Sequence, residues 1–482
     1  MPEKDVRFPT RGAILLFLIL CARSVFSQTA PASPDRPWHA PQEQEIERDA
    51  KNVRSHMFSI DPARTYSLPE LIDLAEAHNP ETRLAWERAR GQAASLGVAR
   101  SELYPTLAAL ALSQTNRSEV LFGSSFYRQT VQAFQGAFDL NYTIFDFGGR
   151  SGRIAAARAE VLAANFGFND THRKVIYQVE QDYYRLLNAL GQEDAAQASL
   201  ANAQTVQQAA EDRLKHGLAT LPDVLEAQSV TAQTEYELQA ALGAEEIARG
   251  NLATTLGTSP TTVIHVQPLN QLAAPESLDD TVQQAIGRAF GQRPDLMQQV
   301  AEIRSANGRV KEARAAFYPS LSLNVTPGMQ SLYGSQQFFP RTNTTVLEGG
   351  LSVSLNWTVF DGGSRKSNLV RAQANVRAAE AQANLVRDQI ADEVWTAYSQ
   401  LNTAFRQRQA ANALLQAANQ SYAAALESYN YGLRSLLDVT QAQQTLAQAR
   451  SSDVLARTQV LGALAGLAFQ TGDLIQAGAR KP

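Results

Sequence analysis

The chain has 482 residues, long enough for two or more domains, and carries a net charge of −4. This mildly acidic balance, with a sequence pI of about 6.0, argues against a nucleic-acid-binding protein. Apolar residues make up 44% of the sequence, and much of that share is alanine. Such a composition favours long helices over a thick globular core.

Residues 1–28 are typical of a secretory signal peptide, because basic residues precede the apolar run 13–20. The run is too short to span a bilayer. Cys21, the only cysteine, would leave with the signal. The alternative is a lipidated N-terminus at Cys21, which Leu20 disfavours because a small residue should precede a lipidated cysteine.

The predicted mature chain then contains no cysteine and no disulfide framework, although it is exported. It also contains no hydrophobic helix long enough for a membrane, so we expect any membrane contact to come from strands. Residues 29–66 hold five prolines. They predict an extended N-terminal segment with a short polar helix near 42–54.

A first block, residues 67–275, predicts helix, strand, strand, long helix and returning helix in that order. Helical periodicity continues to Leu103 and is interrupted once, at Asn79-Pro80, where proline suits the start of a second helix. Alternating apolar and polar residues predict strands at about 105–115 and 131–145, with a polar tip between them.

The next segment predicts one very long helix at about 150–216, because it contains no proline. A helix of that length would reach about 100 Å. Gly217 breaks the pattern, and a returning helix starts at 220–223. A seam with the three- and four-residue spacing of a coiled coil runs along the long helix. Its residues are Val175, Val179, Tyr183, Leu186 and Leu190.

A second block, residues 276–482, repeats this pattern with strands at about 319–327 and 347–360 and a long helix at about 364–431. Tyr318-Pro319 matches Tyr104-Pro105 of the first block. The second seam matches the first position by position, in Ile390, Val394, Tyr398, Leu401 and Phe405. Because the match covers most of the mature chain, we infer an internal duplication.

A glycine-rich turn joins the second strand to the long helix in both blocks, and glycine lets the backbone leave the strand direction without a Cβ clash. The turn residues are Asp146, Gly148 and Gly149 in the first block and Asp361, Gly362 and Gly363 in the second. Such a turn could also hold a phosphate, but the sequence contains no G-x-x-x-x-G-K-[ST] motif.

One chain supplies four predicted strands of roughly bilayer-spanning length. Four strands cannot close a barrel, and lipid does not tolerate open strand edges, so several chains must pool their strands. A dimer would give about eight strands, too few for an open pore, whereas a trimer would give about twelve. The long helices would then project from one end of the barrel as a tube.

These features resemble the TolC-like outer-membrane efflux protein family. The resemblance rests on the two Tyr-Pro pairs, the two Phe-Asp-(Phe)-Gly-Gly turns, and the Gly-Leu turns at Gly217 and Gly432. It implies a mixed α and β membrane protein in which a homotrimer forms a 12-stranded β-barrel continued by a long α-helical periplasmic barrel. It also implies outer-membrane lipid around the barrel, and a periplasmic adaptor protein and an inner-membrane pump as partners.

The resemblance further implies two sets of site residues at the far end of the long helices. The adaptor-contact tips would be Gly217, Leu218, Gly432 and Leu433, and the periplasmic gate would comprise Asp223, Tyr429, Arg434 and Asp438. The local alternative is that the glycines only end helices and that the two aspartates only cap helix starts. Gln441 stands where some family members carry a second acid, which leaves cation selectivity open.

No enzyme, metal site or cofactor is predicted, because the six histidines lack metal-ligand spacing and no nucleophile motif such as G-x-S-x-G is present. The expected function is the exit duct of a tripartite efflux or type I secretion system. The alternative is an exported coiled-coil scaffold without channel activity, although a scaffold has no use for four strands with an apolar face. The sequence leaves open whether the cargo is a drug, a metal or a protein.

Overall fold

A computed structural model of the chain describes residues 35, 43–52, 58–272, 275, 277 and 281–474. The predicted signal peptide, 1–28, lies outside the described residues. The chain divides into two units, Met1–His56 and Met57–Pro482, which are described separately. In the first unit the described helix is α2 (Glu43–Asn52), which is polar, with acidic residues in its first turn.

The second unit contains the helices and strands of both repeats. Its helices are α3 (Leu68–His78), α4 (Pro80–Ser101), α5 (Gly149–Lys215), α6 (Leu221–Thr255), α7 (Val282–Gln292), α8 (Pro294–Ala315), α9 (Ser364–Asn430) and α10 (Leu436–Thr471). The long helices α5 and α9 begin and end within one residue of the predicted bounds, about 150–216 and 364–431. The reason is local, since glycine in the left-handed conformation flanks both ends of each helix.

Four antiparallel strands form one sheet in the order β2-β3-β5-β6. The strands are β2 (Thr106–Phe122), β3 (Ser125–Phe145), β5 (Ser320–Gln336) and β6 (Thr342–Asn356). Within the described part of one chain, β2 and β6 each pair on one side only. The sheet therefore has two open edges.

Three of the strands extend further into the tips than the predicted ends near 115, 131 and 327. The prediction treated 116–127 as a polar tip, whereas the β2–β3 ladder continues to the pair Phe122 and Ser125. The error arose because a backbone ladder does not need alternating side chains once a tight turn closes it. An aromatic cluster also holds together the ends of the β2–β3 and β5–β6 hairpins, with edge-to-face contacts among Phe122, Tyr127, Phe338 and Phe339.

The predicted bounds of the last strand, 347–360, were wrong at both ends. β6 begins earlier, at Thr342, and ends at Asn356. Alternation continues through Trp357 and Val359, but the indole of Trp357 donates a hydrogen bond to the Phe317 carbonyl oxygen, 3.2 Å away. The chain leaves the sheet at that point.

The two faces of the sheet differ in chemistry. On one face, paired positions carry apolar side chains, as where Tyr142 faces Leu323 and Leu323 faces Val353. On the other face, the Asn324 amide donates hydrogen bonds to Asp139 at 2.8 Å and to Asn141 at 2.9 Å. One face is thus suited to lipid and the other to water.

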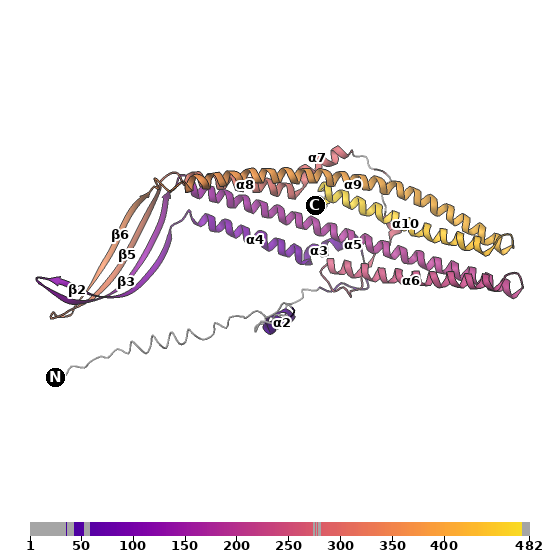
Figure 1. Cartoon of the computed structure of the whole chain (residues 1–482), viewed down its shortest axis with the longest axis horizontal. Coiled ribbons are helices and arrows are strands. Elements are labelled where there is room, and N and C mark those ends of the chain that lie inside the picture. Colours follow the sequence, from indigo (N-terminus) through magenta and orange to yellow (C-terminus); the bar gives the residue numbers. More distant parts are fainter. Residues whose placement is uncertain are drawn as a thin grey trace, which may run out of the picture. The chain divides into compact units, whose positions relative to one another are not determined.

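The helices form a layer in which those of the first repeat lie beside those of the second, as the strands do in the sheet. α5 packs against α4 and α6 on one side and against α8 and α10 on the other, and α9 packs against α8 and α10. Figure 1 shows the strands at one end of α5 and α9 and the helix–helix turns at the other. The helical layer, like the sheet, therefore has two outer edges, one formed by α4 and α6 and the other by α9.

The predicted seams are largely buried, each under a short helix and the neighbouring returning helix: Leu252 of α6 lies in the first core and Leu467 of α10 in the second. Val175, Val179 and Tyr183 of α5 lie in one core with Leu71 and Ala75 of α3. Strands β1 (Thr65–Tyr66) and β4 (His265–Val266) pair beside it, followed by the 3₁₀ turn η1 (Leu269–Gln271). On α9, Ile390, Val394 and Leu401 pack with Ala285 and Ala289 of α7.

Candidate gate at the helix tips

The turn between α5 and α6, here called tip 1, and the turn between α9 and α10, called tip 2, have the same backbone structure. Gly217 and Gly432 take φ values of 72° and 74°. In each tip the next residue closes the helix end: the Leu218 N–H donates to the Arg213 carbonyl and the Leu433 N–H to the Ser428 carbonyl, both at 2.8 Å. These turns are Schellman motifs, in which glycine avoids a Cβ clash.

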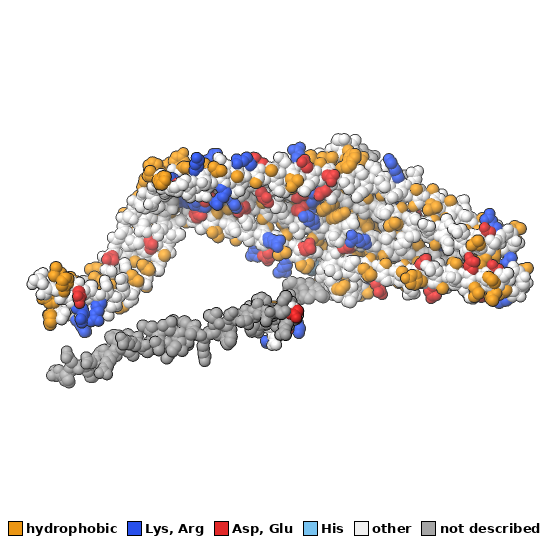
Figure 2. Space-filling model, in the orientation of Figure 1, with side chains coloured by type: hydrophobic (Ala, Val, Ile, Leu, Met, Phe, Trp, Pro, Cys, Tyr) orange, Lys and Arg blue, Asp and Glu red, His pale blue; other side chains and the backbone are white. Residues whose placement is uncertain are grey.

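Both tips present leucine to solvent. Leu218 is 66% exposed and Leu433 is 79% exposed. Leu221 and Leu437, at the starts of the returning helices, are also more than half exposed. Figure 2 shows hydrophobic side chains at this end of the helices. Clustered exposed leucines are a common mark of a protein–protein contact.

Asp223 and Asp438 each cap a helix start. The Asp223 carboxylate accepts hydrogen bonds from the Thr220 N–H at 2.8 Å and the Thr220 hydroxyl at 2.7 Å. Asp438 accepts the equivalent bonds from Ser435, at 3.1 Å and 2.8 Å. Hydrogen bonds from these partners lower the pKa of both carboxyl groups, so both are negatively charged at neutral pH.

Tyr429 lies in the core that joins the two tips. It is 4% exposed and packs with residues of α5, α6 and α10, including Val206, Val224 and Leu436. Burial raises the pKa of its hydroxyl, while the charge of Arg213 lowers it and the charge of Asp223 raises it. The hydroxyl has no hydrogen-bond partner among the described residues.

Arg213 is a site residue that the sequence analysis missed. Its guanidinium lies over the Tyr429 ring, 4.7 Å from the centroid. It also donates a 2.7 Å hydrogen bond to the Tyr429 carbonyl oxygen. A signal was present in the sequence, because the matching position of the second repeat holds Ser428 and the two tips are therefore not equivalent.

Arg434 is exposed, and it makes no ion pair with Asp223 within the described part of one chain. Its charge lowers the pKa of the neighbouring Asp438 carboxyl, after the larger effect of Ser435. The structure thus brings Tyr429 together with Arg213 and leaves Arg434 free to face another molecule.

The strand-to-helix turns hold their aspartates at helix starts. Asp361 accepts hydrogen bonds from the Gly363 N–H at 3.1 Å and the Arg365 N–H at 2.9 Å, and Asp146 accepts from Gly148 and Arg150 in the same way. Gly148 and Gly363 take φ values of 99° and 92°. Because a carboxylate already occupies the N–H groups of each helix start, the turns are structural caps and not phosphate sites.

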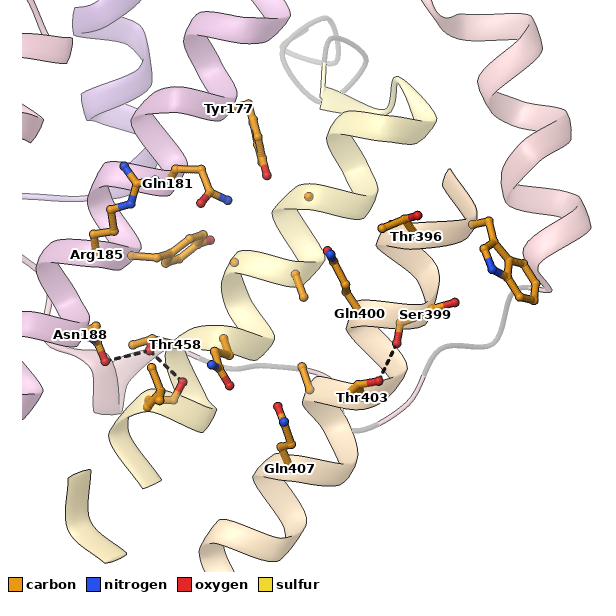
Figure 3. A pocket seen from close by; sticks show the side chains of 18 residues that line it. Tyr177, Gln181, Arg185, Asn188, Thr396, Ser399, Gln400, Thr403, Gln407 and Thr458 are labelled. Atoms are coloured by element: carbon orange, nitrogen blue, oxygen red, sulfur yellow. Dashed lines mark hydrogen bonds between the residues drawn. The ribbon is translucent and has the colours of Figure 1, made fainter. Parts of the chain in front are cut away.

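A groove of about 770 Å³, lined by both polar and apolar side chains, runs between α5, α9 and α10. Figure 3 shows Gln181 and Asn188 on α5 at one side and Thr396, Gln400 and Gln407 on α9 at the other, with α10 between them. On α5 these residues follow the buried seam by two positions, which is about 200° around the helix. The groove therefore lies on the face opposite to the short helix α3.

A family model described as "Outer membrane efflux protein" matches residues 71–258 and 285–473. The chain belongs to the outer membrane efflux protein family. Family membership confirms the predicted resemblance and locates the protein in the outer membrane of a bacterium of the Gram-negative type. The double match also agrees with a duplicated sequence.

Individual relatives of this efflux protein point the same way. It is 29% identical to Protein CyaE of Bordetella pertussis, over 85% of this chain and 84% of the relative. It is 25% identical to outer membrane protein OprJ of Pseudomonas aeruginosa, over 65% of this chain and 64% of the relative. The Campylobacter jejuni CmeC outer membrane channel has the same fold, with a TM-score of 0.71 and 21% identity. The match covers 84% of this chain and 85% of that chain.

Two features are absent from the described residues of this efflux protein: a membrane-spanning helix and a metal-binding cluster. None of its described helices is both long and apolar enough to cross a membrane. No group of three or more His, Cys, Asp or Glu side chains in the described ranges could hold a metal ion.

Proposed function

We propose that three copies of this outer membrane efflux protein pool their strands into one barrel and their helices into one tube, forming the exit duct of a tripartite efflux or secretion system. One observation carries the proposal: the open edges of the sheet and of the helical layer correspond. Strand β2 forms one edge of the sheet and follows α4, at one edge of the helical layer. Strand β6 forms the other edge of the sheet and precedes α9, at the other edge of the helical layer. A ring of copies would pair β6 with β2 of the next copy, and α9 with α4 and α6 of the next copy. Closure removes the edges that lipid does not tolerate.

The two faces of the sheet support a barrel with a wet interior. Leu347, Leu351 and Leu355 of β6 lie on one face and are 90%, 75% and 64% exposed. In the proposed barrel this face meets lipid, and the face with Asp139, Asn141 and Asn324 lines the pore.

The groove between α5, α9 and α10 supports the proposal of a tube that carries solutes. Its face of α5 is opposite to the face covered by α3, so in a closed tube with α3 and α7 outside it would line the interior. Its lining mixes glutamine, asparagine, serine and threonine with Arg185 and with apolar side chains such as Trp395 and Leu455. Such a wall allows passage of varied cargo, so selection would lie with the partners.

We further propose that the exposed leucines of tips 1 and 2 contact a periplasmic adaptor, which joins the duct to an inner-membrane pump. The support is the exposure of Leu218 and Leu433 on rigid turns at the end of the helices away from the sheet.

Channel formation is tested by purifying the protein from outer membranes, cross-linking it in detergent and inserting it into planar bilayers. The proposal expects a cross-linked trimer that conducts ions. Protein that stays monomeric after cross-linking and gives no conductance would favour the exported scaffold instead.

A further inference from the structure

We infer that Arg213 is a positioning residue that holds tip 2 against tip 1 within each subunit, and so keeps the tube closed at rest. The inference rests on the proposed channel function and adds a residue to its gate. It follows from three features of Arg213: its hydrogen bonds, its contact with Tyr429, and its absence from the second repeat.

One guanidinium binds both tips. Its Nη1 group donates to the carbonyl oxygens of Tyr429, at 2.7 Å, and Asn430, at 3.3 Å, at the end of α9. Its Nη2 group donates to the Leu218 carbonyl oxygen of tip 1, at 3.4 Å. Charge-assisted hydrogen bonds of this kind are about twice as strong as neutral ones. Separation of the tips would break them.

The location strengthens these bonds. The last carbonyl groups of α9 form the negative end of a helix dipole, which attracts a cation. The guanidinium also lies 4.7 Å above the Tyr429 ring, where the electron-rich face of the ring attracts it. Because the ring is 4% exposed, Arg213 covers a buried surface that would meet water if tip 2 moved away.

The two tips share a hydrophobic core, and Arg213 adds a polar, directional contact at its outer end. Along their length α5 and α9 are separated by α8 and α10, which pack against both. At the tips, Arg213 reaches across to the end of α9 directly. Outward movement of the end of α9 would therefore have to break the Arg213 contact as well as uncover part of this core.

The duplication makes this contact one-sided. The second repeat has Ser428 at the position of Arg213, and serine is too short to bind a neighbouring helix end in the same way. In a ring of three copies, an Arg213 contact would join the tips inside each copy, and a different contact would join tip 2 to the next copy. Opening by release of Arg213 would thus move tip 2 relative to tip 1 of its own chain.

The test compares Arg213→Gln with Lys215→Gln in planar bilayers. Lys215 lies two residues away and pairs with Asp212 of its own helix, so its loss removes the same charge without touching tip 2. We expect Arg213→Gln to raise the open fraction by roughly tenfold, the change expected for loss of one charge-assisted hydrogen bond. Lys215→Gln should conduct like the unmodified channel.

A rescue separates release of the tips from general damage. Cysteines at positions 218 and 430, placed in the Arg213→Gln chain with Cys21→Ser, would join the two turns that Arg213 holds. Cross-linking should restore the low conductance, and a reductant should raise it again. Loss of fold would not respond to a reductant in this way.

If Arg213→Gln trimers conduct like unmodified ones, the inference is overturned while the channel function stands. If unmodified protein forms no channel, the proposed function itself fails. Should Arg213→Gln not assemble, Arg213→Lys keeps the charge but loses the planar fork that donates to both tips. An Arg213→Lys channel with unmodified conductance would also overturn the inference.

Discussion

Gly152 of α5 and Gly308 of α8 bring the two helix backbones into direct contact. A Cβ atom on Gly308 would lie 2.6 Å from the Ala156 backbone nitrogen, and one on Gly152 would lie 2.6 Å from the Glu312 backbone nitrogen. Neither clash can be relieved by a side-chain rotation, because the atoms met are backbone. This crossing sets the distance between α5 and α8 next to the sheet.

Gly308→Ala should therefore destabilise the protein by about 1–3 kcal/mol, the usual cost of overpacking. Gly287→Ala is the matched control, because Gly287 lies in helix α7 with no atom within 4 Å of an added Cβ. That change should stabilise the protein by about 0.5–1 kcal/mol, since alanine favours a helix interior. Thermal loss of the helical circular dichroism signal in detergent measures both, and equal midpoints would refute the close crossing.

Arg173 should be essential for the middle of the helical layer. Its side chain is 1% exposed, pairs with Asp170 at 2.7 Å, and stacks on Phe469 with 4.2 Å to the ring centroid. Arg173→Met leaves buried Asp170 with the exposed Lys174 as its one charged partner among the described residues, and should cost about 3–5 kcal/mol. Lys215→Met, which breaks a pair in which both Lys215 and Asp212 are exposed, should cost about 0–1 kcal/mol. A similar loss in both variants would contradict this difference.

Glu180 should make stability depend on pH. Burial raises the pKa of its carboxyl group from 4.5 to about 7, and one carboxyl oxygen has no partner among the described residues. The folded state therefore keeps a proton that the unfolded state has lost between these values. The contribution of Glu180 to the free energy of unfolding is fully present below about pH 4.5. It is lost as the pH rises through about 7, a total loss of about 3 kcal/mol.

Glu180→Gln removes this dependence, because an amide does not titrate. Its unfolding midpoint should exceed that of the unmodified protein at pH 8 and approach it at pH 5. The exposed Glu226 offers a control, since Glu226→Gln should leave the difference between the two pH values unchanged. A Glu180→Gln protein that keeps the full difference would exclude Glu180 as its source.

The sequence predicted the long helices well because their ends carry local signals. A left-handed glycine lies just before each long helix and another just after it, and these positions are readable without any tertiary contact. The strand ends were poorly predicted for the opposite reason. The ladder beyond Asn116 depends on pairing with Arg128 to Val131. It also depends on aromatic contacts between the ends of the β2–β3 and β5–β6 hairpins, which are far apart in the chain.

The candidate gate was predicted only in part. Asp223 and Asp438 have the helix caps that their spacing indicated. Arg213 looked like an ordinary basic residue in the last turn of a helix. Only the packing of α5 beside α10 brings it to Tyr429, 216 positions away in the chain.

Asp438 should contribute to ion selectivity rather than to closure. It is exposed beside tip 2, and three copies would place three negative charges around the opening. Asp438→Asn should reduce the preference for cations, measured as a smaller reversal potential across a KCl gradient, without raising conductance. Because Gln441 supplies no second acid one turn further on, the preference itself should be weak. An unchanged reversal potential would remove Asp438 from the opening.

Asp223 and Arg434 should form the contact between neighbouring copies. Within one chain Asp223 binds Thr220 through one carboxylate oxygen, while Arg434 is exposed without an ion pair to it. A charged pair that is unmade within one chain but near the meeting point of three is suited to join them. Arg434→Ser should therefore raise single-channel conductance, and Asp223→Asn should do the same although it keeps a polar group at the helix cap.

A charge reversal decides between this contact and simple loss of a cap. The double variant Asp223→Arg with Arg434→Asp destroys the cap but restores opposite charges, so its conductance should fall back towards that of the unmodified channel. Asp438→Asn weakens the matching cap on tip 2 and serves as the reference for a cap effect alone. If the reversed pair conducts as much as either single variant, Asp223 acts only as a helix cap, and the copies are joined elsewhere.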